Sequence, residues 1–220
     1  MRKTLFSGIA ACLFATAATA AEQSPSVIWT VGQADRSASE FALAPDRFRD
    51  FLANDFGYED KYFLVGHSVP AADFPYVLPG PADTWGGTWP TSGWRTHQVN
   101  ILFGLKEIPS DGTCTLVVDL LDYAKNFLPL VKVSVNTQDA KFQLDAPGLS
   151  VADQRKPNQM EKIVDTLSIT GNLAKATPRR LEIPIRPGVL KAGGNEVTIT
   201  VLEGSWILFD RVSPVSYTHL

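Results

Sequence analysis

Apolar and polar side chains alternate along most of this chain in short runs, and turn-forming residues separate the runs. An alternation with a period of two indicates a β-strand that buries one of its faces. About nine short strands joined by turn-rich connections fit a two-sheet sandwich, so the sequence predicts an all-β fold, an antiparallel β-sandwich or jelly roll. The expected strands are 27–32, 61–66, 98–103, 114–121, 131–136, 140–144, 180–185, 196–202 and 206–212.

Helical periodicity is confined to short segments. In Pro45–Asn54, three apolar side chains recur at the spacing of one helix face, and 153–167 is a second candidate for a turn or two of helix. The run Gly193-Gly194-Asn195 predicts a tight connection with positive φ angles before the last strand pair. Residues 21–215 are therefore expected to form one β-sandwich domain with one or two short helices, in which Trp29 and Trp206 lie on strands and face the core.

The N-terminus has the parts of a secretory signal peptide. Arg2 and Lys3 precede an apolar run, and Ala18-Thr19-Ala20 forms a small-residue cleavage site. The run is shorter than the roughly 20 apolar residues that span a bilayer. Residues 1–20 are therefore expected to be removed, and the mature protein to be secreted or periplasmic. A lipoprotein signal ending at Cys12 is the alternative, although it would leave a very short apolar stretch before the cysteine.

Charge and cysteine content narrow the possible partners. Removal of residues 1–20 takes away two positive charges and no negative ones, so the net charge of -3 becomes -3 - 2 = -5. Nucleic-acid binders usually carry a concentrated basic face, so nucleic acid is not an expected partner. A membrane is not expected either, because no other segment approaches the length of a membrane span. Cys114 then remains as the only thiol, which excludes an intramolecular disulfide. Stability must come from packing.

The last five residues, SYTHL, resemble the translated read-through of a sequencing adapter. They show no patterning that would attach them to the preceding strand. Residues 216–220 are therefore expected to be a non-native tail, with the native polypeptide continuing beyond Val215. An ordinary frayed C-terminus is the alternative.

Aromatic side chains gather in a loop rich in glycine and proline between Phe74 and His97. Exposed aromatic rings in a loop either fold back onto the core or form a platform for a ligand with apolar faces, such as a sugar ring. A neighbouring arginine suits a uronate carboxylate, and a histidine can donate to a sugar hydroxyl. The candidate carbohydrate-binding residues are Tyr76, Trp85, Trp89, Trp94, Arg95 and His97.

Each of these candidates also has a structural interpretation. One or two of the rings can cap the sandwich, because tryptophan is often largely buried. Arg95 can form a surface ion pair, and His97 can begin a strand and point at solvent.

Catalytic and metal-binding signals are weak. The sequence contains no Gly-x-Ser-x-Gly, no His-Glu-x-x-His and no phosphate-binding loop. His67 and Asp73 form an acid–base candidate without a third partner, so no catalytic residue is assigned. Asp83 and Asp210 are candidates for a structural calcium, whose remaining oxygen ligands a sequence does not reveal. Asp210 can instead pair with Arg211 or cap a turn.

Four segments carry a resemblance to a known family: Trp29–Asp35 with Ser39-Glu40-Phe41, Asp73-Phe74-Pro75-Tyr76, Gly194–Ile199 and Trp206–Val212. In this order they resemble the opening, an Asp-aromatic-Pro element, the penultimate strand and the closing strand of the carbohydrate-binding-like third domain of family 4 polysaccharide lyases, the rhamnogalacturonan lyases. The resemblance extends over residues 27–213. It implies a galactose-binding-like jelly roll that accompanies a lyase catalytic domain acting on plant cell-wall pectin.

Two features depart from that family. In those lyases the domain comes last, whereas here it follows the signal peptide directly, and the segment DTWGGTWPTSGWRT is not part of the family pattern. We expect a secreted, non-catalytic carbohydrate-binding module from the N-terminal part of a larger rhamnogalacturonan-degrading enzyme. Its expected partners are a pectic glycan and a downstream catalytic domain. The alternatives are a part of a lyase that cleaves rhamnogalacturonan by β-elimination and a structural domain that braces a catalytic unit.

Overall fold

The computed structural model describes residues 26–48, 61–83, 97–108, 113–145, 166–174 and 176–217, and two sheets account for most of these residues. The first sheet contains β1 (Ser26–Val27), β2 (Val31–Gly32), β4 (Val77–Leu78), β6 (Thr113–Tyr123), β9 (Arg179–Ile185) and β11 (Ile207–Tyr217). The second contains β3 (Lys61–Leu64), β5 (Gln98–Leu105), β7 (Leu130–Val135), β8 (Gln138–Gln143) and β10 (Gly193–Glu203). The helices are η1 (Pro45–Arg47), α2 (Pro70–Asp73) and α3 (Thr166–Ile169).

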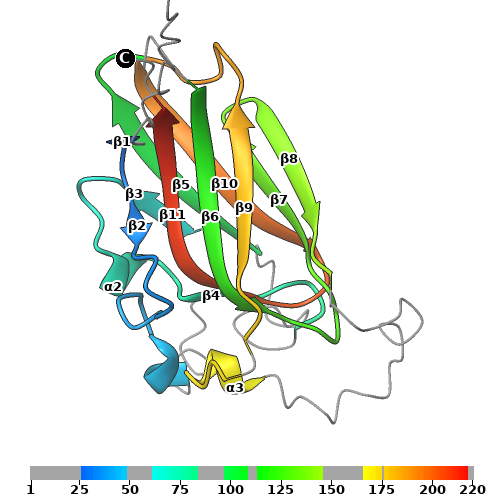
Figure 1. Ribbon diagram of the computed structural model, residues 1–220. Helices are drawn as coiled ribbons and strands as arrows, with labels where there is room; N and C mark the ends of the chain where they lie inside the picture. Colours follow the sequence, from blue (N-terminus) through cyan, green and yellow to red (C-terminus); the bar gives the residue numbers. More distant parts are fainter. Residues whose placement is uncertain are drawn as a thin grey trace, which may run out of the picture.

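The two sheets lie face to face as a sandwich (Figure 1). Strand order in the first is β1-β11-β6-β9, and in the second β3-β5-β10-β7-β8. The pairings between these strands are antiparallel except that of β3 with β5, which is parallel. The predicted fold class, an all-β sandwich, is confirmed.

The core fills the space between the sheets, because the strands alternate as the sequence predicts. On β10, Val197, Ile199 and Val201 are at most 1% exposed, and the polar residues between them face outward. On β6, Leu116 and Val118 are completely buried. Each such aliphatic side chain contributes about 1.5–3 kcal/mol through burial.

Aromatic rings pack at one edge of this core. The ring of Phe74 is completely buried and lies 5.1–5.8 Å, between centroids, from the rings of Phe41, Phe63 and Phe209. Contacts of this geometry add to the area that the rings bury. Trp29 and Trp206 are 8% and 4% exposed, so both belong to the core as predicted.

Several element boundaries differ from the prediction. The expected strand 27–32 is divided into β1 and β2, both of which pair with β11. Strand β4 and helix α2 were not predicted, because two strand residues and four helix residues are too short to show a period. The expected helix at 45–54 begins as the 3-10 helix η1, and its residues from 49 on lie outside the described residues, as do 153–165.

The chain's C-terminal strand corrects one expectation. Ser216 pairs with Cys114 on one side and Ser26 on the other, and Tyr217 pairs with Thr113. The expectation that nothing attaches residues after Val215 to the preceding strand is therefore wrong for these two residues, because backbone pairing does not require an alternating pattern. The origin of residues 216–220 stays a prediction.

Among the described residues, no helix has both the length and the apolar character needed to cross a membrane.

Candidate carbohydrate-binding site

Tyr76 is a core residue in this structure. Its side chain is completely buried, and its hydroxyl donates to the Ile169 carbonyl at 3.0 Å. Burial also raises the pKa of this phenol. Because its ring is not accessible to a glycan here, the expected role of Tyr76 as a wall of the site does not agree with its position, and we leave it out of the proposed site.

His97 lies directly before β5 and is half-buried. Its Nδ1 is buried and has no hydrogen-bond partner. Burial lowers the pKa of this imidazole, and a hydrogen bond with the Pro79 backbone partly opposes the effect. The ring is therefore neutral at neutral pH and turned partly inward, instead of pointing freely at solvent.

The remaining candidates, Trp85, Trp89, Trp94 and Arg95, lie outside the described residues. The described residues on either side of them meet the same part of the fold. The Asp83 carboxylate accepts hydrogen bonds from the Gly80 amide, at 2.8 Å, and from the Ser205 hydroxyl, while the His97 carbonyl accepts from the Val201 amide at 2.9 Å. The segment that carries the tryptophans thus starts and ends beside the connection from β10 to β11.

Asp83 anchors this end of the sandwich. It is only 8% exposed, and burial raises the pKa of its carboxyl to about 6, although the hydrogen bonds from Ser205 and Gly80 oppose that rise. Both carboxylate oxygens accept hydrogen bonds from the protein. Among the described residues, no three His, Cys, Asp or Glu side chains come together as a possible metal site. The calcium predicted at Asp83 and Asp210 stays untested.

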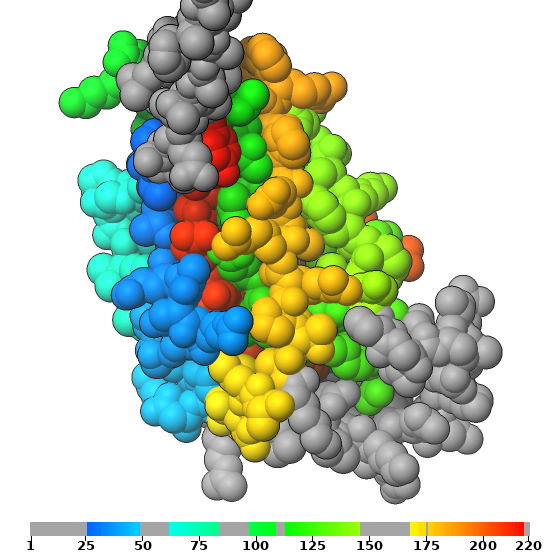
Figure 2. Space-filling model, in the orientation of Figure 1, coloured from blue at the N-terminus to red at the C-terminus, as the bar shows by residue number. Residues whose placement is uncertain are grey.

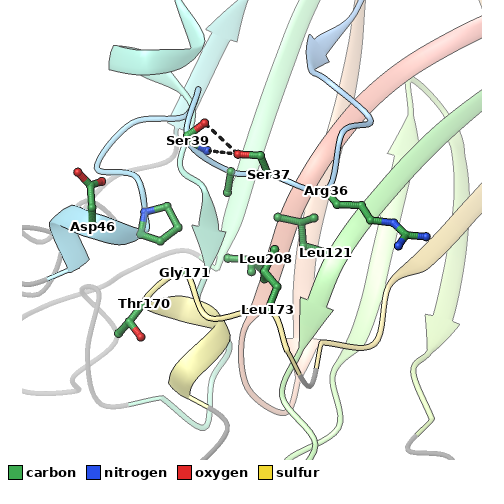
Figure 3. Close-up of a pocket in the computed structure, with 11 residues that line it drawn as sticks. Arg36, Ser37, Ser39, Asp46, Leu121, Thr170, Gly171, Leu173 and Leu208 are labelled. Carbon is green, nitrogen blue, oxygen red and sulfur yellow. Dashed lines mark hydrogen bonds between the residues drawn. The ribbon is translucent and has the colours of Figure 1, made fainter.

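A pocket of about 380 Å³ lies where the 36–46 segment meets the turn after α3 (Figure 3). Leu121, Leu173 and Leu208 form its apolar side. Hydroxyl and carboxyl groups line the remainder, from Ser37, Ser39, Asp46 and Thr170. This combination of an apolar surface with a few polar groups is typical of small-molecule sites. Leu121 and Leu208 are at most 1% exposed and lie at the bottom of the pocket, whereas Leu173 is partly exposed.

Acidic side chains hold the loop above this pocket in shape. The Asp35 carboxylate accepts from the Ser37 amide at 2.9 Å, and Glu40 accepts from the Gln33 amide at 2.9 Å. Asp210, at an irregularity in the pairing of β11 with β6, accepts from the Arg36 amide at 3.1 Å. Asp210 therefore caps a turn, which is one of the two alternatives that the sequence predicts for it. The hydrogen bond holds Arg36 with a positive φ of 64°.

Arg211, the other predicted partner of Asp210, contacts a different residue. Its guanidinium lies 2.8 Å from Asp119, which also accepts from Arg180 at 2.7 Å. These three side chains come from adjacent strands, β11, β6 and β9. The pairing raises the pKa of Arg180, mainly through its hydrogen bond to Asp119. The trio is an ion-pair cluster on the outer face of the first sheet.

His67 and Asp73 do not form an acid–base pair in the structure. Asp73 accepts a hydrogen bond from the Val69 amide at 2.7 Å and so holds the start of α2. His67 is exposed in the turn after β3, and its described hydrogen bond is that of its backbone amide to Leu64. The geometry therefore gives no support to catalysis by these two residues.

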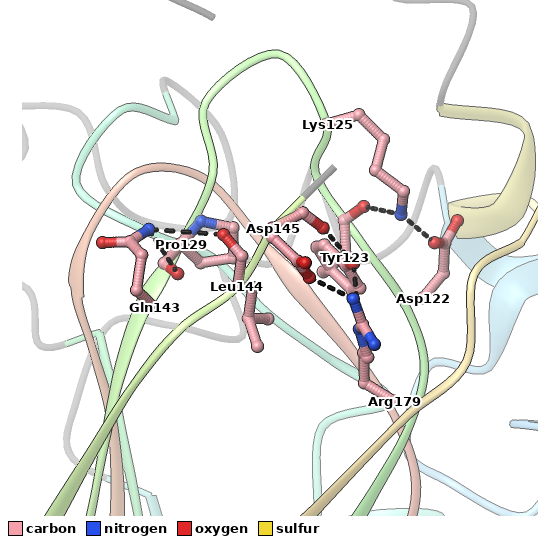
Figure 4. Close-up of polar contacts among 8 residues, drawn as sticks. All are labelled: Asp122, Tyr123, Lys125, Pro129, Gln143, Leu144, Asp145 and Arg179. Carbon is pink, nitrogen blue, oxygen red and sulfur yellow. Dashed lines mark hydrogen bonds and ion pairs between the residues drawn. The ribbon is translucent and has the colours of Figure 1, made fainter. Parts of the chain in front are cut away.

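A polar network connects the loops at the end of the sandwich where β6 and β8 end and β9 begins (Figure 4). The Tyr123 hydroxyl donates to the Asp145 carbonyl, and Arg179 contacts both Tyr123 and Asp145. Lys125 pairs with Asp122 and donates to the Tyr123 carbonyl at 2.6 Å. The network joins the end of β6, the end of β8 and the start of β9, and it fixes these loops in place.

A two-sheet antiparallel sandwich with loop pockets is an architecture shared by many carbohydrate-binding domains, and comparison with known families agrees. Residues 27–213 match the family of CBM-like domains described as polysaccharide lyase family 4, domain III. The chain belongs to this family of carbohydrate-binding-like domains. A search of the curated proteins found no match.

Solved structures similar to this chain include parts of carbohydrate-active enzymes. A family GH115 4-O-methyl-α-glucuronidase with specificity for decorated arabinogalactans is 14% identical, with a TM-score of 0.31 over 53% of this chain and 13% of that one. A cycloalternan-forming enzyme from Listeria monocytogenes is 16% identical, with a TM-score of 0.31 over 53% and 8%. A ruminal GH26 endo-β-1,4-mannanase is 16% identical, with a TM-score of 0.31 over 65% and 26%.

The residues that carry the family resemblance have structural roles in this chain. Gly32 has a φ of +80°, and a Cβ there would lie 2.4 Å from both the Asp210 carbonyl and the Phe41 ring. Phe41 and Phe74 are core residues. Asn195 accepts from the Lys191 amide at 2.9 Å. The motif therefore marks the architecture, and the pocket residues Ser37, Thr170 and Leu173 carried no signal that sequence reasoning detected.

Proposed function

We propose that this chain is a secreted, non-catalytic carbohydrate-binding domain that holds a larger rhamnogalacturonan-degrading lyase on plant cell-wall pectin. The observation that carries the proposal is the family match over residues 27–213. The pectic ligand, the downstream catalytic domain and export follow from the resemblance to the lyases and from the signal-peptide pattern of residues 1–20.

The described side chains support binding more than catalysis. The buried carboxylates of Asp83, Asp119 and Asp210 accept hydrogen bonds from backbone or side-chain donors and hold loops or strands together. The pocket of Figure 3 instead offers an apolar side, hydroxyl groups and the single carboxyl of Asp46. We propose that this pocket binds a sugar. Trp85, Trp89, Trp94, Arg95 and His97 remain proposed contacts of the same glycan.

Two assays on the full chain test this proposal. Calorimetric titration with rhamnogalacturonan oligosaccharides should give saturable heat, and Trp89→Ala should weaken binding by roughly tenfold if its ring stacks on a sugar. The matched control is Trp29→Phe, because Trp29 is a core residue. Incubation of the chain with rhamnogalacturonan should release no products that carry an unsaturated uronate. Release of such products would show that the domain itself is a lyase.

A further inference from the structure

We propose that a groove on the outer face of the second sheet binds one uncharged pyranose residue of a glycan chain. The groove lies where β3, β5 and β10 run side by side, and it is a shallow, open hollow of about 460 Å³. It is separate from the pocket of Figure 3, with which it shares no lining residue. The inference rests on the proposed carbohydrate-binding function and names a site and a sugar type for it.

Two glycines make the floor of the groove. Gly104 of β5 and Gly194 of β10 are directly paired. A Cβ on Gly194 would have no neighbour within 4 Å, and one on Gly104 would approach only the Gly193 carbonyl, at 4.0 Å. By contrast, a Cβ on Gly32, Gly80 or Gly204 would lie within 2.4 Å of another atom. Packing therefore does not require glycine at 104 or 194. A glycine in a strand often marks a bulge, a tight bend or a place where a ligand or another backbone approaches closely, and the open space above these two glycines fits the approach of a ligand.

An apolar wall stands beside this floor. Leu64 of β3 is 43% exposed, and it pairs with Leu102 of β5, which also lines the groove. Tyr62, two residues earlier on the same face of β3, is 57% exposed. Large apolar side chains that stay exposed next to a hollow offer a surface for the C–H face of a sugar ring.

The opposite side of the groove is held by a hydrogen-bonded frame. The Asn136 side chain donates to the Val189 carbonyl at 2.7 Å and to Asn195 at 2.8 Å, and it accepts from the Glu196 amide at 2.9 Å. The Asn195 side chain in turn bonds the Lys191 amide at 2.9 Å and its carbonyl at 2.8 Å. The backbones of Lys191 and Glu196 are thus fixed before any ligand binds, which reduces the entropy lost on binding.

The side chains of Lys191 and Glu196 are exposed and line the groove. Neither has a hydrogen bond or ion pair with another described residue. An ammonium group donates hydrogen bonds and a carboxylate accepts them, so the two together complement sugar hydroxyls, which do both. Their charges cancel. The carboxylate of a uronate would be attracted by the Lys191 ammonium but repelled by the Glu196 carboxylate, so the groove favours an uncharged sugar residue.

Substitution of the floor tests the site. Gly104→Val fills the groove with a side chain that strands favour, and its φ is not in the left-handed region. Thr115→Val introduces the same residue type on β6 in the other sheet, away from the groove, and serves as the control. Calorimetric titrations of the full chain with a neutral β-1,4-galacto-oligosaccharide should show roughly tenfold weaker binding for Gly104→Val and unchanged binding for Thr115→Val. Circular dichroism and thermal unfolding establish that both variants are folded.

Removal of the negative charge of Glu196 gives an independent test, because it should change which sugars the groove prefers. Glu196→Gln removes the repulsion, so the affinity for an oligogalacturonate should rise by roughly fivefold or more. If Gly104→Val binds the neutral probe as tightly as the unmodified chain does, the groove is not the binding site, although the proposed function remains intact. Tighter binding of the oligogalacturonate by the unmodified chain would overturn the selectivity for an uncharged residue. Absence of binding to any glycan would overturn both the groove and the proposed function.

Discussion

At the scale of single residues, the buried acidic side chains of this domain act as anchors for its loops. Asp83 receives hydrogen bonds from Gly80 and Ser205, and Asp210 receives one from Arg36. Burial raises the pKa of each of these two carboxyls to about 6. A carboxylate that loses water on folding is stabilised only in part by such bonds. The stability of the loops next to the candidate sites is therefore expected to depend on pH.

The pH dependence of stability can be predicted for Asp83. Its pKa in the folded state, about 6, lies above its ordinary value of 3.8. The stabilisation that its protonated form provides is therefore complete below about pH 4 and is lost as the pH rises through about 6. Relative to Asp83→Asn, the free energy of unfolding of the unmodified chain should fall by roughly 3 kcal/mol over this range. Urea unfolding of both proteins checks this, and parallel curves would contradict it.

Three aromatic residues show which positions the sequence predicts correctly and which it does not. Trp29 and Trp206 lie in alternating runs, and the alternation correctly placed both in the core. The position of Tyr76 in the loop rich in glycine and proline predicts a wall of the binding site, yet its ring is buried and its hydroxyl donates to the Ile169 carbonyl. That contact joins residues 93 positions apart. Long-range packing of this kind leaves no local pattern, so the sequence did not reveal it.

At the scale of elements, the long strands were predictable and the short ones were not. The alternating runs of β6 and β10 appear directly in the sequence, and the structure extends each to 11 residues. Strands β1, β2 and β4 have two residues each and exist because they pair with successive parts of β11. Their formation depends on the partner strand. The connection after β10 depends likewise on close contacts, at Gly204.

The contact at Gly204 predicts a large effect of substitution. Its φ is +80°, and a Cβ there would lie 2.3 Å from the Leu128 carbonyl. Gly188 has a similar φ of +79° but nothing within 4 Å of such a Cβ. Gly188→Ala should therefore cost about 1–2 kcal/mol, the cost of left-handed backbone alone. Gly204→Ala should cost at least about 2 kcal/mol more. Chemical denaturation measures both, and equal losses would show that the close contact is unimportant.

At the scale of the whole molecule, the two outer faces differ in how their charges are used. On the first sheet, Asp119 pairs with Arg180 and Arg211 across three adjacent strands. On the second, the charged side chains of Lys191 and Glu196 border an open groove. The Asp119 cluster is therefore paired within the first sheet, whereas Lys191 and Glu196 beside the second sheet are exposed to solvent. A glycan that contacts this domain is expected on the second sheet and at the loop pocket.

Export of the whole molecule is a further prediction. If residues 1–20 are a signal peptide, the exported protein should begin at Ala21. Intact mass and N-terminal sequencing of protein recovered outside the cytoplasm check this. A lipid-modified N-terminus at Cys12, or retention of Met1, would contradict the proposed processing.

The most direct test of pectin binding by this domain is a calorimetric titration of the unmodified full chain with rhamnogalacturonan oligosaccharides, with cello-oligosaccharides of equal length as the comparison. A domain that binds pectin should give saturable heat with the pectic oligosaccharides and weaker or no heat with the cello-oligosaccharides. A folded protein that gives no heat with any pectic glycan would contradict carbohydrate binding as its function, and would favour a domain that braces a catalytic neighbour.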